Sequence, residues 1–308
     1  MIAVEDLTVY VPKNKIPLSG VLNAGAISKY TYLRLRKEGY RDILCDENKT
    51  GLEMIFKLLD QIYEKDREVF KKVKYLVLSF GPGILPNNLN LTKIIEERYD
   101  TRIPIIFSVL DLYCATFIKG VDVATNLLRF EGEKGTKAIV ISSIKNIIPE
   151  QRYDGSYVAG DACTLLVLNN EDKGDRIETI KTSMDTKTIK LKEDGTPHWD
   201  SSYFFNITET ISEALIETNL SKDEIAMIFP NNVSDEVWKS VAILLRIPFE
   251  DFSMESHQLY GRLPGLDYFI NLSLAKKKNL IHNDRYYMVV SIGGGGIVGC
   301  MILKKRHS

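Results

Sequence analysis

The predicted helices and strands of this chain occur twice in the same order, and this repetition constrains the fold more than any other feature. In the first copy, a buried strand, two helical patterns and a second buried strand lie at 75–80, 91–99, 117–128 and 138–142. In the second copy, the same kinds of element lie at 225–229, 237–245, 265–278 and 286–291. The offset stays at about 150 residues, which is typical of an internal duplication. We therefore expect two similar α/β halves, residues 1–170 and 171–308, whose two mixed sheets pack about shared helices.

Two stretches of the chain give weak secondary-structure signals. The region between the first strand and Lys49 is rich in turn residues. Residues 170–200 are polar and contain Gly174, Gly195 and Pro197. We expect this second stretch to be irregular and to mark the boundary between the halves.

The charge balance excludes some partners. The 308 residues include 40 Lys and Arg against 41 Asp and Glu, so the formal net charge of -1 creates no field that attracts nucleic acid or an anionic membrane. The first residues, MIAVEDLTVYVPKNK, are typical of a strand, and no stretch approaches the length of a membrane span. We expect a cytoplasmic protein without nucleic-acid or membrane partners.

The cysteines and histidines do not form a ligand pattern. Four cysteines occur without a CxxC motif, at Cys45, Cys114, Cys163 and Cys300. Four histidines occur without a pair at helical spacing, at His198, His257, His282 and His307. We therefore expect neither a disulfide framework nor a metal site, and we interpret the histidines as surface or loop residues.

Cys114 is the candidate nucleophile. Residues 107–112 favour a strand, and the residues after Cys114 show helical spacing of apolar side chains, at Phe117, Val121, Ala124 and Leu128. A thiol at the start of a helix lies near the positive end of the helix dipole, so we expect its thiolate to be favoured. The alternative is an ordinary buried cysteine, because free cysteines often fill cores.

Four motifs carry a resemblance to a known family. They are DLYCATF at 111–117, GDA at 160–162, the glycines at 293–295 with Gly299, and the opening VYVP at 9–12. Together they resemble the ketoacyl-acyl-carrier-protein synthase III group of the thiolase superfamily, with Thr116 in place of the family's glycine. The resemblance implies a duplicated five-layer αβαβα architecture, with two mixed sheets and central helices, and a dimer.

The family's chemistry uses a cysteine, a histidine and an asparagine. The cysteine accepts an acyl group as a thioester, and the other two stabilise the enolate formed when a malonyl unit loses carbon dioxide. The resemblance places these roles on Cys114, Asn231 and Arg262. Asn231 can donate a hydrogen bond but cannot transfer a proton, and Arg262 would bring a permanent cation. We therefore expect that ordinary decarboxylative condensation does not occur.

Further groups have candidate roles in the site. An oxyanion could be held by the backbone N–H groups of Cys114 and Gly294, each worth about 3 kcal/mol in rate. The loop at 293–296 also resembles a phosphate cradle, but it lacks the lysine of a P-loop, so the structural and oxyanion interpretations are preferred. His257 precedes Gly261 by four residues and is a possible base.

Three functions remain open at this point. The first is an acyltransferase that loads Cys114 from an acyl-coenzyme A or acyl carrier protein thioester, in fatty acid, polyketide or secondary-metabolite biosynthesis. It needs no cofactor beyond the coenzyme A or phosphopantetheine of its substrate. The second is a non-catalytic subunit that pairs with a related condensing enzyme, so a homodimer and a heterodimer both remain possible. The third is a thioester hydrolase that uses His257.

The interpretation that the substituted positions have no function also remains open. Asn231 and Arg262 could be the result of drift in a site that no longer turns over. Arg262 is long and could instead reach solvent, and His257 could be an ordinary loop residue. The sequence alone does not decide between these interpretations.

Overall fold

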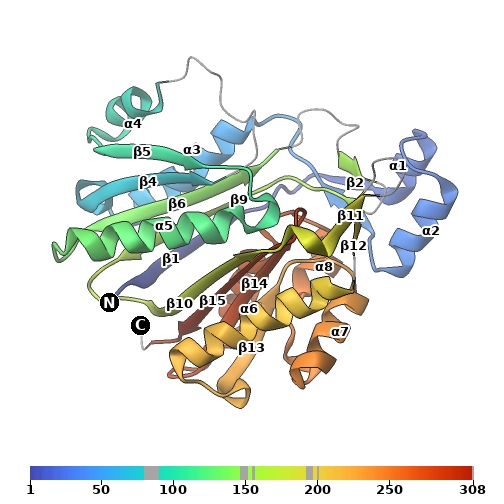
Figure 1. The fold of residues 1–308 in the computed structure, drawn as a ribbon. Coiled ribbons are helices and arrows are strands. Elements are labelled where there is room, and N and C mark those ends of the chain that lie inside the picture. The colour runs from blue at the N-terminus through green and yellow to red at the C-terminus, as the bar shows by residue number, and fades with distance from the viewer. Residues whose placement is uncertain (80–89, 146–151, 155–156, 192–196, 200, 307–308) are drawn as a thin grey trace.

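The computed structural model describes residues 1–79, 90–145, 152–154, 157–191, 197–199 and 201–306. Its main feature is a nine-stranded sheet in the order β13-β14-β15-β10-β1-β9-β6-β4-β5 (Figure 1). In chain order these strands are β1 Ala3–Tyr10, β4 Val73–Ser79, β5 Ile105–Val109, β6 Lys137–Ile144, β9 Ala162–Asn169, β10 Asp175–Met184, β13 Ile225–Pro230, β14 Tyr286–Gly293 and β15 Ile297–Lys304.

Helices and short strand pairs complete the fold. The helices are α1 Leu18–Asn23, α2 Lys29–Lys37, α3 Gly51–Lys65, α4 Leu91–Tyr99, α5 Thr116–Glu131, α6 Ser202–Thr218, α7 Asp235–Leu245, α8 Glu255–Tyr260 and α9 Asp267–Lys277. The short pairs are β2 Lys15–Pro17 with β3 Asp42–Leu44, β7 Tyr153–Asp154 with β8 Tyr157–Val158, and β11 Ile189–Leu191 with β12 Pro197–Trp199.

The two halves are built alike, as the sequence predicts. Each contains parallel neighbours, β4 with β5 and β6 in the first half and β13 with β14 in the second. Each continues through antiparallel strands, β6-β9-β1 and β14-β15-β10. The predicted boundary at residue 170 falls in the turn between β9 and β10.

The halves share one continuous sheet, which differs from the expectation of two separate sheets. The join is short, with Ala3 opposite Arg176 and Val4 opposite Asp175. The register of β1 against β9 then shifts between Val4 and Asp6. A bulge of this kind increases the local twist, so β1 leaves β10 after two residue pairs and the half-sheets diverge.

The layers follow from the alternation of side chains along the strands. Tyr75 and Val77 of β4 belong to a central cluster that also contains α5 and α9, whereas Leu76 and Leu78 pack with α3 and α4. In the second half, Tyr287 and Val289 of β14 face the same central cluster, whereas Met288 and Val290 pack with α6 and α7. The layers are therefore helix, half-sheet, central helices, half-sheet and helix.

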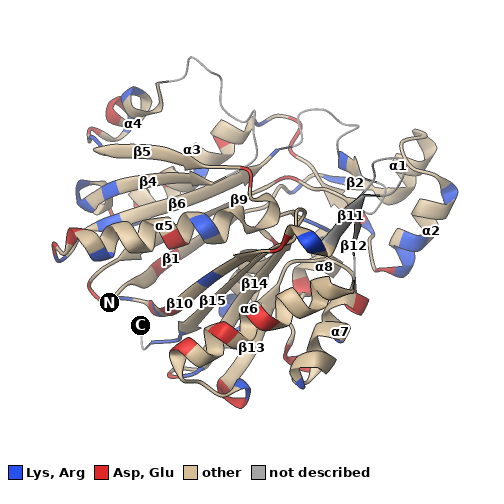
Figure 2. Ribbon diagram, viewed as in Figure 1, with Lys and Arg blue, Asp and Glu red and all other residues tan. Residues whose placement is uncertain are grey.

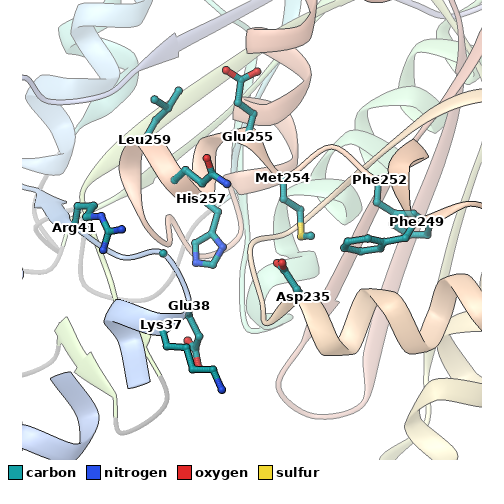
Figure 3. Close-up of a pocket in the computed structure, with 12 residues that line it drawn as sticks. Lys37, Glu38, Arg41, Asp235, Phe249, Phe252, Met254, Glu255, His257 and Leu259 are labelled. Carbon is teal, nitrogen blue, oxygen red and sulfur yellow. The ribbon is translucent and has the colours of Figure 1, made fainter. Parts of the chain in front are cut away.

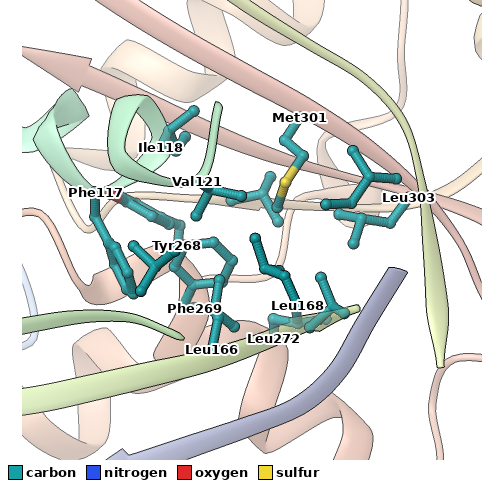
Figure 4. Packing of buried hydrophobic residues seen from close by; sticks show 14 of the residues in the cluster. Phe117, Ile118, Val121, Leu166, Leu168, Tyr268, Phe269, Leu272, Met301 and Leu303 are labelled. Atoms are coloured by element: carbon teal, nitrogen blue, oxygen red, sulfur yellow. The ribbon is translucent and has the colours of Figure 1, made fainter. Parts of the chain in front are cut away.

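The central layer is almost entirely apolar. Figure 4 shows its side chains from α5, α9, β9 and β15, including Val121, Leu272, Leu168 and Leu303. On the outside of the fold, α6 carries Glu209, Glu213 and Glu217 toward solvent, and α2 is basic (Figure 2). The central helices therefore hold the residues at their N-terminal ends in fixed positions.

Two predictions of irregular structure are wrong. The stretch 170–200 contains the ten-residue strand β10, and the turn-rich region before Lys49 contains α1 and α2. β10 is a poor apolar strand because polar side chains occupy its inward positions. Asp175 and Thr179 are nonetheless buried, since Tyr287 donates a hydrogen bond to Asp175 and Thr179 bonds to Glu217. Tertiary partners of this kind cannot be recognised from local sequence.

Candidate active site

Cys114 lies on a strained turn between β5 and α5. It occupies the centre of a short 3₁₀ turn, Tyr113–Ala115, and α5 begins two residues later at Thr116. The backbone of Asp111 and Tyr113 is left-handed, with φ of 64° and 48°. This conformation is uncommon for residues other than glycine and is often found at functional sites. The structure therefore places Cys114 at the predicted strand-to-helix junction, on a sharp backbone turn.

The second half of the chain fixes the backbone of Cys114. Its carbonyl oxygen accepts hydrogen bonds from the hydroxyls of Tyr268, at 3.0 Å, and Ser291, at 2.8 Å. Gly265 has a φ of 74°, and a Cβ there would lie 3.4 Å from the Cα of Cys114. The nucleophile is thus held between the start of α9 and the end of β14.

The glycine loop between β14 and β15 closes over the same turn. A Cβ on Gly293 would lie 3.2 Å from the backbone nitrogen of Cys114. A Cβ on Gly294 or Gly295 would lie 3.0 Å or 2.9 Å from the ring of Tyr113. Only glycines allow the backbone to come this close. The loop is therefore beside the N–H of Cys114, where an oxyanion hole would form, and the role of Gly294 in it stays a prediction.

The side chain of Arg262 reaches the site and is half-buried there. Its guanidinium carbon lies 3.9 Å from the ring centre of Tyr157, and its Nε is buried without a hydrogen-bond partner. Its charge acts on the Cys114 thiol and favours the thiolate. Arg262 is therefore partly enclosed by the protein and partly accessible to solvent, and its role in the site stays a prediction.

The first half of the chain anchors the segment that carries Arg262. The N–H of Gly160 donates a hydrogen bond to the carbonyl of Arg262 at 3.0 Å. Ala159 and Arg262 also form an isolated parallel β-bridge. Gly160 cannot carry a side chain, because a Cβ would lie 2.8 Å from Leu263. The neighbouring Asp161 is fully buried in ion pairs with Arg152 and Lys145. The GDA motif thus supports the position of Arg262.

The electrostatics of Cys114 differ from the expectation. Burial raises the pKa of the Cys114 thiol, and the negative charge of Asp267 raises it further, while Arg262 lowers it. Cys114 lies in the 3₁₀ turn that precedes α5 and not in α5 itself, so the predicted effect of the helix dipole on its thiolate stays a prediction. Within this site, Arg262 is the principal group that favours the thiolate.

Asp267 is a site residue that sequence reasoning missed. Its carboxylate is fully buried and accepts hydrogen bonds from the N–H groups of Leu263 and Asn232. Burial raises the pKa of Asp267 to about 7, although Arg262 and both N–H groups oppose the shift. An acidic residue at the start of a helix, followed at once by apolar residues and close after Arg262, was the available signal.

Asn231 does not lie open to the nucleophile. Its side chain is fully buried, its Nδ2 donates to the carbonyl of Ile292 at 2.9 Å, and its Oδ1 accepts from the N–H of Ile292 at 3.1 Å. The amide thus extends the β13–β14 ladder to the residue before the glycine loop. Asn231 therefore positions the loop, and its predicted catalytic role is untested.

His257 lines a different opening. It lies on α8 and is only 5% exposed, so the interpretation as a surface residue is wrong. Its ring meets Tyr40 edge-on at 4.7 Å, and it borders a pocket of about 790 Å³ with Glu38, Asp235 and Met254 (Figure 3). Burial and Arg262 both lower the pKa of His257. Its role as a base remains a prediction.

Two other cysteines lie in the core, and the described residues contain no cluster of metal ligands. Cys163 and Cys300 are fully buried, and burial raises the pKa of both thiols. In the described part of the chain, no three His, Cys, Asp or Glu side chains are grouped to hold a metal ion. Within the same ranges, no helix combines the length and apolarity needed to cross a membrane.

Comparisons with known proteins agree on one group. Residues 215–305 match the family model of the 3-oxoacyl-[acyl-carrier-protein] synthase III C terminal. A beta-ketoacyl-[acyl-carrier-protein] synthase III of Fusobacterium nucleatum is 23% identical over 218 residues, which span 63% of this chain and 66% of that protein. The chain therefore matches just under two thirds of the length of this curated relative.

Solved structures show the same fold over the whole chain. ChlB3, named as an acyltransferase, superposes with a TM-score of 0.84 at 13% identity, over 99% of this chain and 98% of that one. The 3-oxoacyl-[acyl-carrier-protein] synthase III of Aquifex aeolicus VF5 gives 0.80 at 16% identity, over 99% and 100%. Together with the fold, these matches show that the chain is similar to the 3-oxoacyl-[acyl-carrier-protein] synthase III proteins and shares their fold.

Proposed function

We propose that the protein is an acyltransferase that takes an acyl group from a coenzyme A or carrier thioester onto Cys114 and passes it to an acceptor other than a decarboxylating malonyl unit. The observation that carries this proposal is the guanidinium of Arg262, which has a buried Nε and acts on the Cys114 thiol. The names of the relatives support the broader class, because they describe an acyltransferase and acyl-carrier-protein synthases.

The loading step is a thiol exchange. Cys114 Sγ attacks the thioester carbonyl, the bond from that carbon to the donor sulfur breaks, and the donor thiolate leaves with the proton that Cys114 gives up. No separate base is consumed, because one thiol replaces another. Arg262 stabilises the transient thiolate of Cys114, and N–H groups of Cys114 and Gly294 would bind the oxyanion.

Arg262 also explains why decarboxylation is not expected. Loss of carbon dioxide requires the malonyl carboxylate to give up its charge as the enolate forms. A guanidinium beside the reacting carbon would pair with that carboxylate and stabilise the ground state, which raises the barrier. Asn231 cannot transfer a proton, and its amide is held by two hydrogen bonds to Ile292, so it does not replace a histidine.

The proposal is tested by intact mass spectrometry after exposure to a panel of acyl thioesters of different chain length. We expect a gain of one acyl group in the wild type and none in Cys114→Ala. A malonyl thioester in the same panel should release no carbon dioxide above the Cys114→Ala background. A mass gain that persists in Cys114→Ala would remove Cys114 from its role.

A non-catalytic subunit is the second candidate, since burial raises the pKa of Cys114. In that case no thioester in the panel would modify the protein, and a related condensing enzyme would be its partner. Under the first proposal the protein is a homodimer or a heterodimer with such a relative. A hydrolase would need His257 as its base, and this remains a prediction.

A further inference from the structure

The starting observation is a half-buried cation, Arg262, whose Nε is enclosed by the protein and which has no acidic partner in the described part of the chain. Arg262 forms no ion pair with any Asp or Glu of the described residues, and its Nε has no hydrogen-bond partner. The nearest carboxylate to influence it is Asp267, whose oxygens accept from Leu263 and Asn232. An unpaired buried charge costs several kcal/mol, so a retained one is a candidate for binding an anion that arrives with the substrate.

The surroundings of Arg262 favour a planar anion. The ring of Tyr157 covers one face of the guanidinium at 3.9 Å. The backbone on either side is held, by Gly160 at the carbonyl of Arg262 and by Asp267 at the N–H of Leu263. A guanidinium stacked in this way presents its N–H groups along its edge, and that fork matches the two oxygens of a carboxylate.

The position of Arg262 indicates which reactant carries the carboxylate. After loading, Arg262 lies beside the sulfur of the acyl-enzyme, and the acyl chain extends from the carbonyl away from that sulfur. The acceptor must bring its nucleophilic atom to the same carbonyl carbon. A carboxylate within a few bonds of that atom therefore comes within reach of Arg262, whereas one at the far end of a long acyl chain does not.

We propose that Arg262 binds the carboxylate of the acyl acceptor, and that the acceptor is a small hydroxy or amino acid with its nucleophile close to the carboxylate. This inference rests on the proposed function. In the transfer step the acceptor oxygen or nitrogen bonds to the acyl carbon and the bond from that carbon to Cys114 Sγ breaks. The proton of the acceptor passes to the Cys114 thiolate, which regenerates the thiol without another reagent.

The sharpest test needs no knowledge of the acyl group. Iodoacetate and iodoacetamide alkylate the same thiol, and they differ only in a carboxylate that lies next to the reacting carbon. We expect the ratio of the iodoacetate rate to the iodoacetamide rate at Cys114 to fall by about tenfold or more in Arg262→Gln. One factor of ten corresponds to about 1.4 kcal/mol of anion binding.

Matched variants separate charge from geometry and from folding. Arg262→Lys keeps the charge but loses the fork, so its rate ratio should lie between those of the wild type and Arg262→Gln. Arg129→Gln, which removes an exposed arginine of α5, should leave the ratio unchanged. Cys114→Ala should remain unlabelled, because Cys45, Cys163 and Cys300 are buried. If Arg262→Gln does not fold, the comparison uses Arg262→Lys and the wild type.

A second readout uses the acyl-enzyme. Protein loaded with an acyl group should be discharged by a hydroxy or amino acid about tenfold faster than by the corresponding amide, and Arg262→Gln should lose this preference. Equal alkylation ratios in wild type and Arg262 variants would overturn the inference, and the proposed function would stand if Cys114 still loads. Failure to load Cys114 at all would overturn the proposed function instead.

Discussion

At the scale of single residues, the reactivity of the site depends on two half-buried groups, the thiol of Cys114 and the cation of Arg262. Burial raises the pKa of the Cys114 thiol and so disfavours the thiolate, whereas the charge of Arg262 lowers this pKa and offsets part of the effect. Asp267 opposes Arg262 and holds the loop that carries it. The reactivity of Cys114 therefore depends on the charge of its two neighbours.

The pH dependence of Cys114 alkylation tests this balance. Burial raises the pKa of the thiol and Arg262 lowers it, so removing the cation should raise it further. We expect the rate with neutral iodoacetamide to rise with pH only above the ordinary range of cysteine, and the curve to move to still higher pH in Arg262→Gln. A curve that stays in place or moves to lower pH would contradict the assignment.

Asp267→Asn should change how stability depends on pH. Between about pH 4 and pH 7, Asp267 is protonated in the folded state and ionised in the unfolded state, so wild-type stability falls as pH rises through that window. The variant lacks this contribution. The difference in unfolding free energy between the two proteins should change by up to about 4 kcal/mol across the window and stay constant above it. Urea unfolding at several pH values measures this difference, and a constant difference would be evidence against the raised pKa.

At the scale of elements, the glycine loop is held in place by a side chain from the neighbouring strand. Asn231, at the end of β13, supplies the donor and acceptor that pair with Ile292 of β14. The indole of Trp238 donates to the carbonyl of Asn231 and fixes it from α7. The position to which the resemblance assigns a histidine is thus part of the β13–β14 hydrogen-bond ladder.

Asn231→Ala should therefore destabilise the protein and disturb the loop. It leaves the N–H and the carbonyl of Ile292 unpaired and buried, at about 1–3 kcal/mol for each group. Asn126→Ala, on the exposed face of α5, is the control and should change the unfolding free energy by less than about 0.5 kcal/mol. If the two variants have the same stability by urea unfolding, Asn231 does not have the positioning role.

Elements with apolar periodicity could be predicted from the sequence, and those whose side chains depend on distant partners could not. The pattern at 91–99 matches α4, and 286–291 lies within β14. β10 was missed because Asp175 and Thr179 are buried only through contacts with other elements. The positions of Cys114 and Arg262 followed from the motifs, whereas the buried bonds of Asn231 depend on Ile292, which lies far away in the chain.

At the scale of the whole molecule, the site exists only where the halves meet. Cys114 belongs to the first half, while Arg262, Tyr268, Ser291 and the glycine loop belong to the second. Asp175 lies at the join of the half-sheets, opposite Val4 of β1. It pairs with Lys276 of α9 and with Lys305, and accepts from Tyr287 of β14.

Asp175→Asn should lower the free energy of unfolding of the whole molecule and not of one half alone. The change removes the carboxylate that forms ion pairs with Lys276 and Lys305 and leaves their positive charges unpaired. We therefore expect a loss of about 3 kcal/mol in the free energy of unfolding. Glu68→Gln removes an exposed partner of Lys71 and should cost less than about 1 kcal/mol. Two separate unfolding transitions in urea, with only one of them shifted, would show that Asp175 does not connect the halves.

The central claim is that Cys114 receives an acyl group, and peptide mapping tests it most directly. Wild-type protein is incubated with an acyl thioester, digested, and searched by mass spectrometry for the acylated residue. The account predicts one acyl group on the peptide that contains Cys114, removed by hydroxylamine as a thioester should be. An acyl group on any other residue, or an unmodified Cys114 with every thioester tried, would contradict it.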